Sequence, residues 1–61
     1  MPFVTIKFLE GRTDDQKKAV VEEVTEVVAK NLGAPKENIH VFLEEMKKKD
    51  YGVAGVRKSD I

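Results

Sequence analysis

The sequence predicts an α/β fold, a βαβ subunit in which one helix joins two parallel strands and a short hairpin follows at the C-terminus. Two segments rich in β-branched and aromatic residues flank a long stretch whose apolar residues recur at helical spacing. An apolar segment with two glycines ends this pattern, as in a tight turn between short strands. The 61 residues contain no linker or repeat, so a single domain over residues 1–61 is expected.

The first strand is predicted over residues Pro2–Leu9, which include two valine or isoleucine and two phenylalanine residues. Because side chains alternate between the two faces of a strand, Val4, Ile6 and Phe8 share one face. That face is wholly apolar, so we expect it to pack against the helix.

The helix is predicted to begin after Thr13. Thr13 and Gln16 have the spacing of a capping box, in which each side chain binds the backbone N–H of the other residue. Helical spacing then continues to Leu32. The apolar residues that recur at this spacing are Val20, Val21, Val24, Val27, Val28 and Leu32.

The helix is predicted to end before Gly33, since glycine favours the left-handed conformation that closes many helices. Pro35 prevents the helix from continuing. On the polar face, Glu26 precedes Lys30 by four residues, which is the favourable order for an ion pair.

A second strand is predicted over Ile39–Met46, after a turn at residues 35–38. Two strands joined by a helix of this length favour a right-handed crossover with parallel strands. The apolar segment Tyr51–Val56, with its two glycines, is predicted to form a short hairpin or a bulged extension.

The length of the chain also predicts that it assembles with other chains. Folding a monomer of this size would remove about 6,000 Å² of surface from water, and burial of the apolar part would stabilise the fold by roughly 85–90 kcal/mol. The loss of conformational entropy on ordering the chain would cost roughly 90 kcal/mol. Small domains with such a balance usually need disulfides, a metal or oligomerisation. The chain has no cysteine and one histidine, so oligomerisation is the expected source of additional stability.

The composition excludes several classes of protein. Eleven basic and eleven acidic residues give a formal charge of zero, so no nucleic-acid partner is expected despite the basic clusters at residues 47–49 and 57–58. Strictly apolar runs do not exceed three residues, too few for a membrane span or a signal peptide. A cytoplasmic protein is expected.

Few side chains in the sequence suggest catalysis, because cysteine nucleophiles, phosphate-binding glycine loops and carboxylate clusters are all absent. Pro2 is the exception. Removal of Met1 would leave a free secondary amine, and an α-amine ordinarily has a pKa near 8. An apolar pocket and a nearby cation would lower that pKa and give a general base at neutral pH. Proline is also common at strand starts, so Pro2 alone leaves a structural role open.

Several segments together resemble the 4-oxalocrotonate tautomerase family across essentially the whole chain. They are the start Pro2–Lys7, the run Leu9–Lys17 with Leu-Glu-Gly-Arg, Glu45-Met46, and Tyr51–Gly55. The resemblance implies a subunit that dimerises into a four-stranded sheet, with the short members forming hexamers (trimers of dimers). It also implies a cofactor-free isomerase that converts 2-hydroxydienoates and related 2-oxo acids between their enol and keto forms.

The resemblance assigns roles to individual residues. Pro2 would act as general base and then as general acid, and Arg12 would bind a substrate carboxylate. Leu9 matches a position whose backbone contacts substrate through water, and Tyr51 matches an aromatic residue that keeps the pocket apolar. Taken alone, Arg12 would be read as a solvated turn residue and Tyr51 as interface packing.

His40 departs from the family pattern, because the founding activity uses a second arginine at this position. Histidine can donate a hydrogen bond to substrate but cannot provide the two-pronged contact of arginine. We therefore expect weaker tautomerisation or a substrate other than a dicarboxylate. A histidine bonded to water or to a neighbouring subunit is an equally good reading.

Two alternative functions remain open from the sequence. One is an oligomeric relative that is weakly active or not catalytic, which His40 or a retained Met1 would favour. The other is hydration or dehalogenation of an unsaturated acid at the same site, as other members of the superfamily perform.

Overall fold

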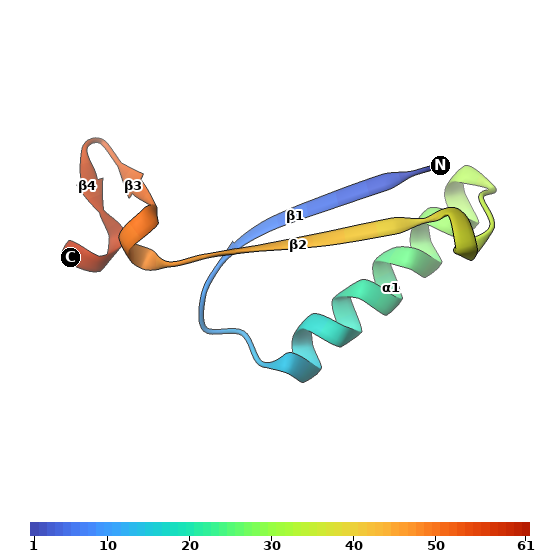
Figure 1. Cartoon of the computed structure of the whole chain (residues 1–61), viewed down its shortest axis with the longest axis horizontal. Helices are drawn as coiled ribbons and strands as arrows, with labels where there is room; N and C mark the ends of the chain where they lie inside the picture. Colours follow the sequence, from blue (N-terminus) through green and yellow to red (C-terminus); the bar gives the residue numbers. More distant parts are fainter.

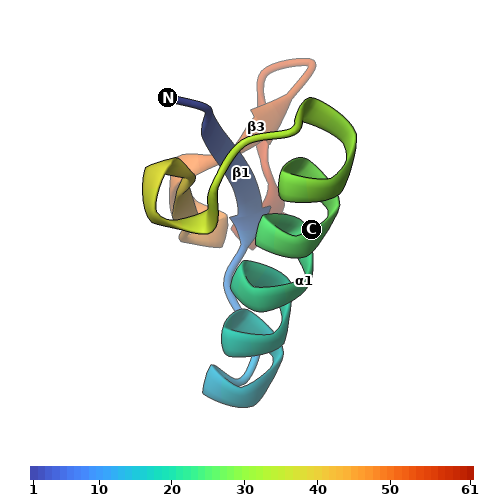
Figure 2. The ribbon, with the colours of Figure 1, turned by 90° about the vertical axis from the view of Figure 1, so that its right-hand side faces the viewer.

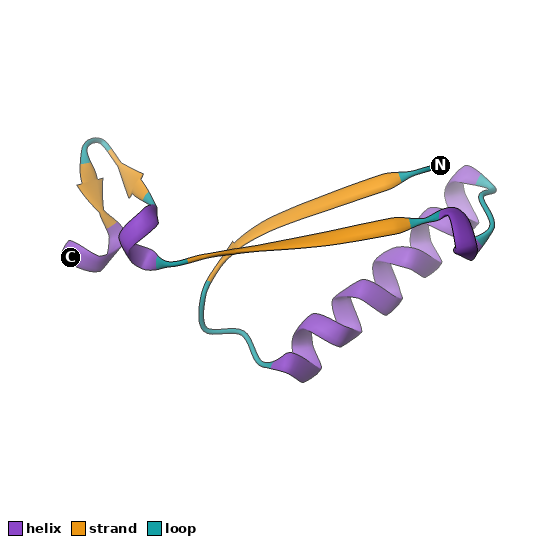
Figure 3. Ribbon diagram, in the orientation of Figure 1, coloured by secondary structure: helices purple, strands orange, loops and turns teal.

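A computed structural model describes all residues 1–61 (Figures 1 and 3). Strand β1 (Phe3–Leu9) leads into helix α1 (Asp14–Leu32), strand β2 (His40–Met46) and a hairpin of β3 (Gly52–Val53) and β4 (Val56–Arg57). Short 3-10 helices cover Lys36–Asn38, Lys48–Asp50 and Lys58–Asp60. None of the helices combines the length and the apolar character that crossing a membrane requires.

The two long strands pair in parallel, as predicted, from Phe3 opposite His40 to Leu9 opposite Met46. Backbone hydrogen bonds extend the pairing by one residue at each end. The His40 N–H donates to the Pro2 carbonyl at 3.0 Å, and the Glu10 N–H donates to the Met46 carbonyl at 2.8 Å. The predicted βαβ fold class is therefore confirmed.

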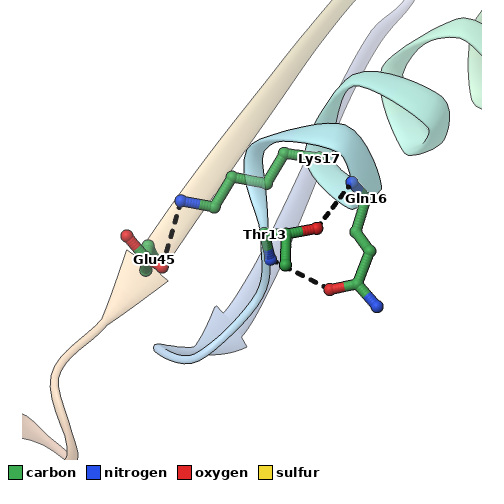
Figure 4. A network of polar contacts seen from close by, with 4 residues as sticks. All are labelled: Thr13, Gln16, Lys17 and Glu45. Atoms are coloured by element: carbon green, nitrogen blue, oxygen red, sulfur yellow. Dashed lines mark hydrogen bonds and ion pairs between the residues drawn. The ribbon is translucent and has the colours of Figure 1, made fainter.

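The helix begins and ends as the sequence predicts. Thr13 Oγ1 accepts from the Gln16 N–H at 3.1 Å, and Gln16 Oε1 accepts from the Thr13 N–H at 2.9 Å (Figure 4). Gly33 closes the helix with φ of 65°, in the left-handed region. The predicted ion pair on the polar face is wrong, because Glu26 binds Lys36 in the following turn instead of Lys30.

We expect Thr13→Ala to lower the free energy of unfolding by about 1 kcal/mol, because the Gln16 N–H loses its acceptor. Denaturant unfolding at one fixed protein concentration measures this change. Thr13→Ser retains the hydroxyl and should match the wild type, whereas equal losses in both variants would contradict a capping role.

Helix α1 covers only one face of the two-stranded sheet, as the end-on view shows (Figure 2). On that face Val4, Ile6 and Phe8 are half-buried, as predicted. On the opposite face Phe3 remains 63% exposed and Phe42 remains 49% exposed. Two aromatic rings are therefore left uncovered on this face of the sheet in the single chain.

The hairpin extends from the end of the sheet opposite the N-terminus (Figure 1). Strands β3 and β4 pair antiparallel, and both residues between them have positive φ, 54° at Ala54 and 85° at Gly55. Such a pair matches the twist of a tight two-residue hairpin. The predicted C-terminal hairpin is thus confirmed.

The isolated subunit has no closed core. No residue is fully buried, and the chain exposes 4905 Å² where a compact protein of this mass exposes about 4,000 Å². The radius of gyration is 14.7 Å, against about 10–11 Å for a compact chain of this length. These dimensions fit a subunit that neighbouring chains complete.

Candidate active site

Pro2 lies at the amino end of β1, where it is half-buried beside the first residue of β2. Its carbonyl accepts the His40 N–H, and the His40 ring stacks on the Phe3 ring with centroids 5.0 Å apart. His40 Nε2 is enclosed and has no hydrogen-bond partner. Pro2 and His40, both predicted site residues, are therefore neighbours in one chain.

Arg12 lies just beyond the other end of β1, close to the start of α1. Leu9 is the last strand residue there, and Gly11, with φ of 117°, turns the chain before Arg12. Glycine adopts this φ without the strain that a side chain would bring. The Arg12 side chain is exposed and forms no ion pair within the chain, so its charge is available to an anion.

A hollow of about 410 Å³ opens between this end of the sheet and the first turns of α1. Its floor is apolar and its polar rim contains Arg12 together with two residues that sequence reasoning did not select. The lining residues are Ile6, Phe8, Arg12, Gln16, Lys17, Ala19, Val20 and Leu43. The only signal for Gln16 and Lys17 in the sequence was their position near the start of the helix that follows Arg12.

The two cations on the rim are not equivalent. Lys17 Nζ lies 3.1 Å from a carboxylate oxygen of Glu45 on β2 (Figure 4). It also lies 5.9 Å from the centre of the Phe8 ring. The Lys17 charge is thus largely balanced by Glu45, whereas the Arg12 charge is not. One net positive charge therefore stands beside an apolar floor.

Tyr51 precedes β3, at the base of the hairpin, and the residue is 37% exposed. Its carbonyl accepts the Lys58 N–H at 2.8 Å, which closes the hairpin. A second, smaller hollow of about 340 Å³ lies in the C-terminal arm, residues 48–61. It is lined mainly by apolar residues: Tyr51, Val53, Val56, Lys58 and Ile61.

One chain does not bring all the predicted site residues together. Pro2 and Arg12 lie at opposite ends of β1, and a strand of seven residues spans about 20 Å. Tyr51 directly precedes β3, and the hairpin that β3 begins extends beyond the Arg12 end of the sheet (Figure 1). The structure thus groups Pro2 with His40, and Leu9 with Arg12, in two separate places. Groups of three or more histidine and carboxylate side chains that could hold a metal ion are not present.

Comparison with known proteins shows the family to which the chain belongs. A family model described as tautomerase enzyme matches residues 2–61. The chain belongs to the tautomerase family.

Named relatives match the chain over its whole length. It is 88% identical to a probable tautomerase of Listeria monocytogenes, over all of both chains. It is 59% identical to the 2-hydroxymuconate tautomerase of Bacillus subtilis, over 100% of this chain and 98% of that protein. The crystal structure of YwhB, a homologue of 4-oxalocrotonate tautomerase, superposes with a TM-score of 0.91, at 58% identity and over 98% of each chain.

These findings confirm the resemblance seen in the sequence and the fold class it implied. The protein is an isomerase of the tautomerase type.

Proposed function

We propose that the protein is a cofactor-free tautomerase that converts a 2-hydroxydienoate or related 2-oxo acid between its enol and keto forms. Pro2, freed by removal of Met1, is the general base and then the general acid. The observation that carries this proposal is the position of Pro2, half-buried at the amino end of β1 and bonded through its carbonyl to His40, in a chain of the tautomerase family.

The pocket is completed by pairing two subunits through the free edges of their β1 strands. Strand β1 is paired on one edge only, with β2. Antiparallel pairing of two β1 strands about a two-fold axis gives a four-stranded sheet and places Pro2 next to Arg12 of the partner subunit. The hairpin arms and the open sheet face then join such dimers, and we infer a hexamer.

The reaction itself needs only one proton carrier. The Pro2 nitrogen takes the proton of the substrate 2-hydroxyl, and the electron pair of that O–H bond forms the new carbonyl. The double bonds shift along the diene, and a carbon at its other end receives the proton from the Pro2 ammonium. Arg12 holds the carboxylate through two parallel hydrogen bonds. An apolar wall and this guanidinium both lower the pKa of the Pro2 amine, which keeps it basic near neutral pH.

The charges near Arg12 and near Pro2 favour a substrate with one carboxylate. At the Arg12 end, one cation is unpaired. At the Pro2 end, the neighbouring side chains are His40 and Phe3, and Lys36 in the preceding turn is paired with Glu26. His40 stands where the founding activity has a second arginine, so a second carboxylate lacks a fixed cation.

We expect 2-hydroxypenta-2,4-dienoate to be converted with a kcat/KM at least equal to that for 2-hydroxymuconate, which carries an additional carboxylate. His40→Arg should raise kcat/KM for the dicarboxylate alone, by about tenfold or more, because the guanidinium would pair with the additional carboxylate and a hydrogen bond to a charged group contributes about 1.5–3 kcal/mol. Ketonisation rates followed by ultraviolet absorbance measure both. Equal gains for the two substrates would contradict a role for residue 40 in recognising the second carboxylate.

Ketonisation of these substrates and of phenylenolpyruvate by the mature protein tests the proposed function directly. Mass determination should show that Met1 has been removed. A mature protein that begins at Pro2 and turns over none of the three substrates would refute the proposal. Hydration or dehalogenation of an unsaturated acid, measured in separate assays, would identify the alternative chemistry.

A further inference from the structure

Glu10 connects two parts of the subunit that the sheet alone leaves loosely joined. Its N–H donates to the Met46 carbonyl at 2.8 Å, the last backbone bond at this end of the β1–β2 pair. Its carboxylate Oε1 accepts the N–H of Lys48 at 3.1 Å, across 38 residues of sequence. One residue thus binds the chain both at the end of β2 and at the start of the arm that follows.

This contact is the one side-chain bond between the body of the subunit and its arm. All other side-chain hydrogen bonds and ion pairs join residues within 1–46 or within 57–60. Within the arm, β4 packs against the 3-10 helix Lys48–Asp50, which also contacts the 3-10 helix Lys58–Asp60. Without the Glu10 contact, backbone torsions near Lys47 would be the main restraint on the direction of the arm.

Glu10 also immediately precedes the turn that leads to Arg12. Gly11 redirects the chain with φ of 117°, and Arg12 follows at the rim of the larger hollow. On the other side of the contact, Tyr51 follows the 3-10 helix whose first N–H is held by Glu10. Glu10 is therefore connected to both segments. It adjoins the turn that carries Arg12, and its carboxylate binds the segment that carries Tyr51.

We propose that Glu10 is a positioning residue, which sets the direction of the hairpin arm relative to the Arg12 turn. Its carboxylate fixes the Lys48 N–H, and the arm then presents Tyr51 at a defined angle to a neighbouring subunit. The consequence for activity rests on the proposed function, in which Arg12 and Tyr51 contribute to shared pockets. Glu10 itself does not touch the substrate.

The test compares Glu10→Ala, Glu10→Gln and a control, Glu23→Ala. Gln retains an acceptor oxygen, whereas Ala does not, and Glu23 is an exposed helix residue without a side-chain bond in the structure. Hydrogen exchange at the Lys48 amide reports the contact. Fluorescence of Tyr51 reports the arm, because Tyr51 is the single tyrosine and the chain has no tryptophan.

For Glu10→Ala we expect about tenfold faster exchange at Lys48, a changed Tyr51 emission and about a tenfold lower kcat/KM, as loss of a hydrogen bond to a charged group implies. Glu10→Gln should restore all three, and Glu23→Ala should leave them unchanged. Wild-type exchange and emission in Glu10→Ala would overturn the proposal. If Glu10→Ala does not fold, Glu10→Gln provides the test. Lys48 exchange at the wild-type rate in Glu10→Gln supports the proposal, and faster exchange overturns it.

These readouts separate this inference from the proposed function. If the wild type shows no tautomerase activity but Glu10→Ala alone has fast Lys48 exchange and altered emission, the positioning role stands and the proposed function fails. If the wild type is active and Glu10→Ala loses activity without either change, the proposed function stands and the positioning role fails.

Discussion

Insertion of one glycine between Met1 and Pro2 is expected to abolish tautomerisation without unfolding the protein. Removal of Met1 then leaves glycine at the N-terminus, and the Pro2 nitrogen is an amide that cannot accept a proton. The insertion lies before β1, whose first residue is Phe3, so the strand and its pairing with β2 are unaffected. Ketonisation assays and circular dichroism measure the two expectations.

Pro2→Ala is the matched variant, because it keeps a free amine but loses the rigid ring. A general base contributes about 10²–10⁴-fold to a rate, so we expect kcat to fall by about 10²-fold here and to background in the glycine insertion. Undiminished turnover by the insertion variant would contradict the assignment of the Pro2 nitrogen as the base.

Phe42→Asp is expected to disrupt assembly, folding and activity together. Phe42 is 49% exposed on the sheet face that α1 does not cover, where the proposed oligomer buries it. The substitution removes an apolar contact and places an unpaired carboxylate in that interface, which should weaken association by more than 100-fold. Sedimentation and circular dichroism over a dilution series measure association and folding.

Phe42→Leu is the control, because it retains an apolar side chain and should assemble as the wild type does. A folded, monomeric Phe42→Asp would show that the subunit is stable alone, contrary to the shortage of core seen in the single chain. An assembled and active Phe42→Asp would show that this face is not the interface.

Local structure was predictable because its signals are local. The capping box of Thr13 and Gln16 and the left-handed Gly33 depend on residues within a few positions of one another. The alternation of Val4, Ile6 and Phe8 fixed which face meets the helix. The ion pair expected for Glu26 failed because Lys36, beyond the helix end, competes successfully with Lys30.

The site was less predictable, since its parts meet only through long-range contacts or through other chains. The family pattern selected Pro2 and Arg12, and the structure then showed that they stand at opposite ends of one strand. The role of Glu10 was missed because its partner, Lys48, is 38 residues away and binds through its backbone, which leaves no trace in residue type.

Mixing two inactive variants tests most directly whether the active site combines Pro2 of one chain with Arg12 of another. One variant carries the glycine insertion before Pro2, and the other carries Arg12→Ala. After co-refolding in equal amounts, about a quarter of the pockets should pair an intact Pro2 with an intact Arg12, if subunits combine at random. We predict that the mixture regains about this fraction of wild-type activity. A mixture as inactive as its components would contradict a shared site.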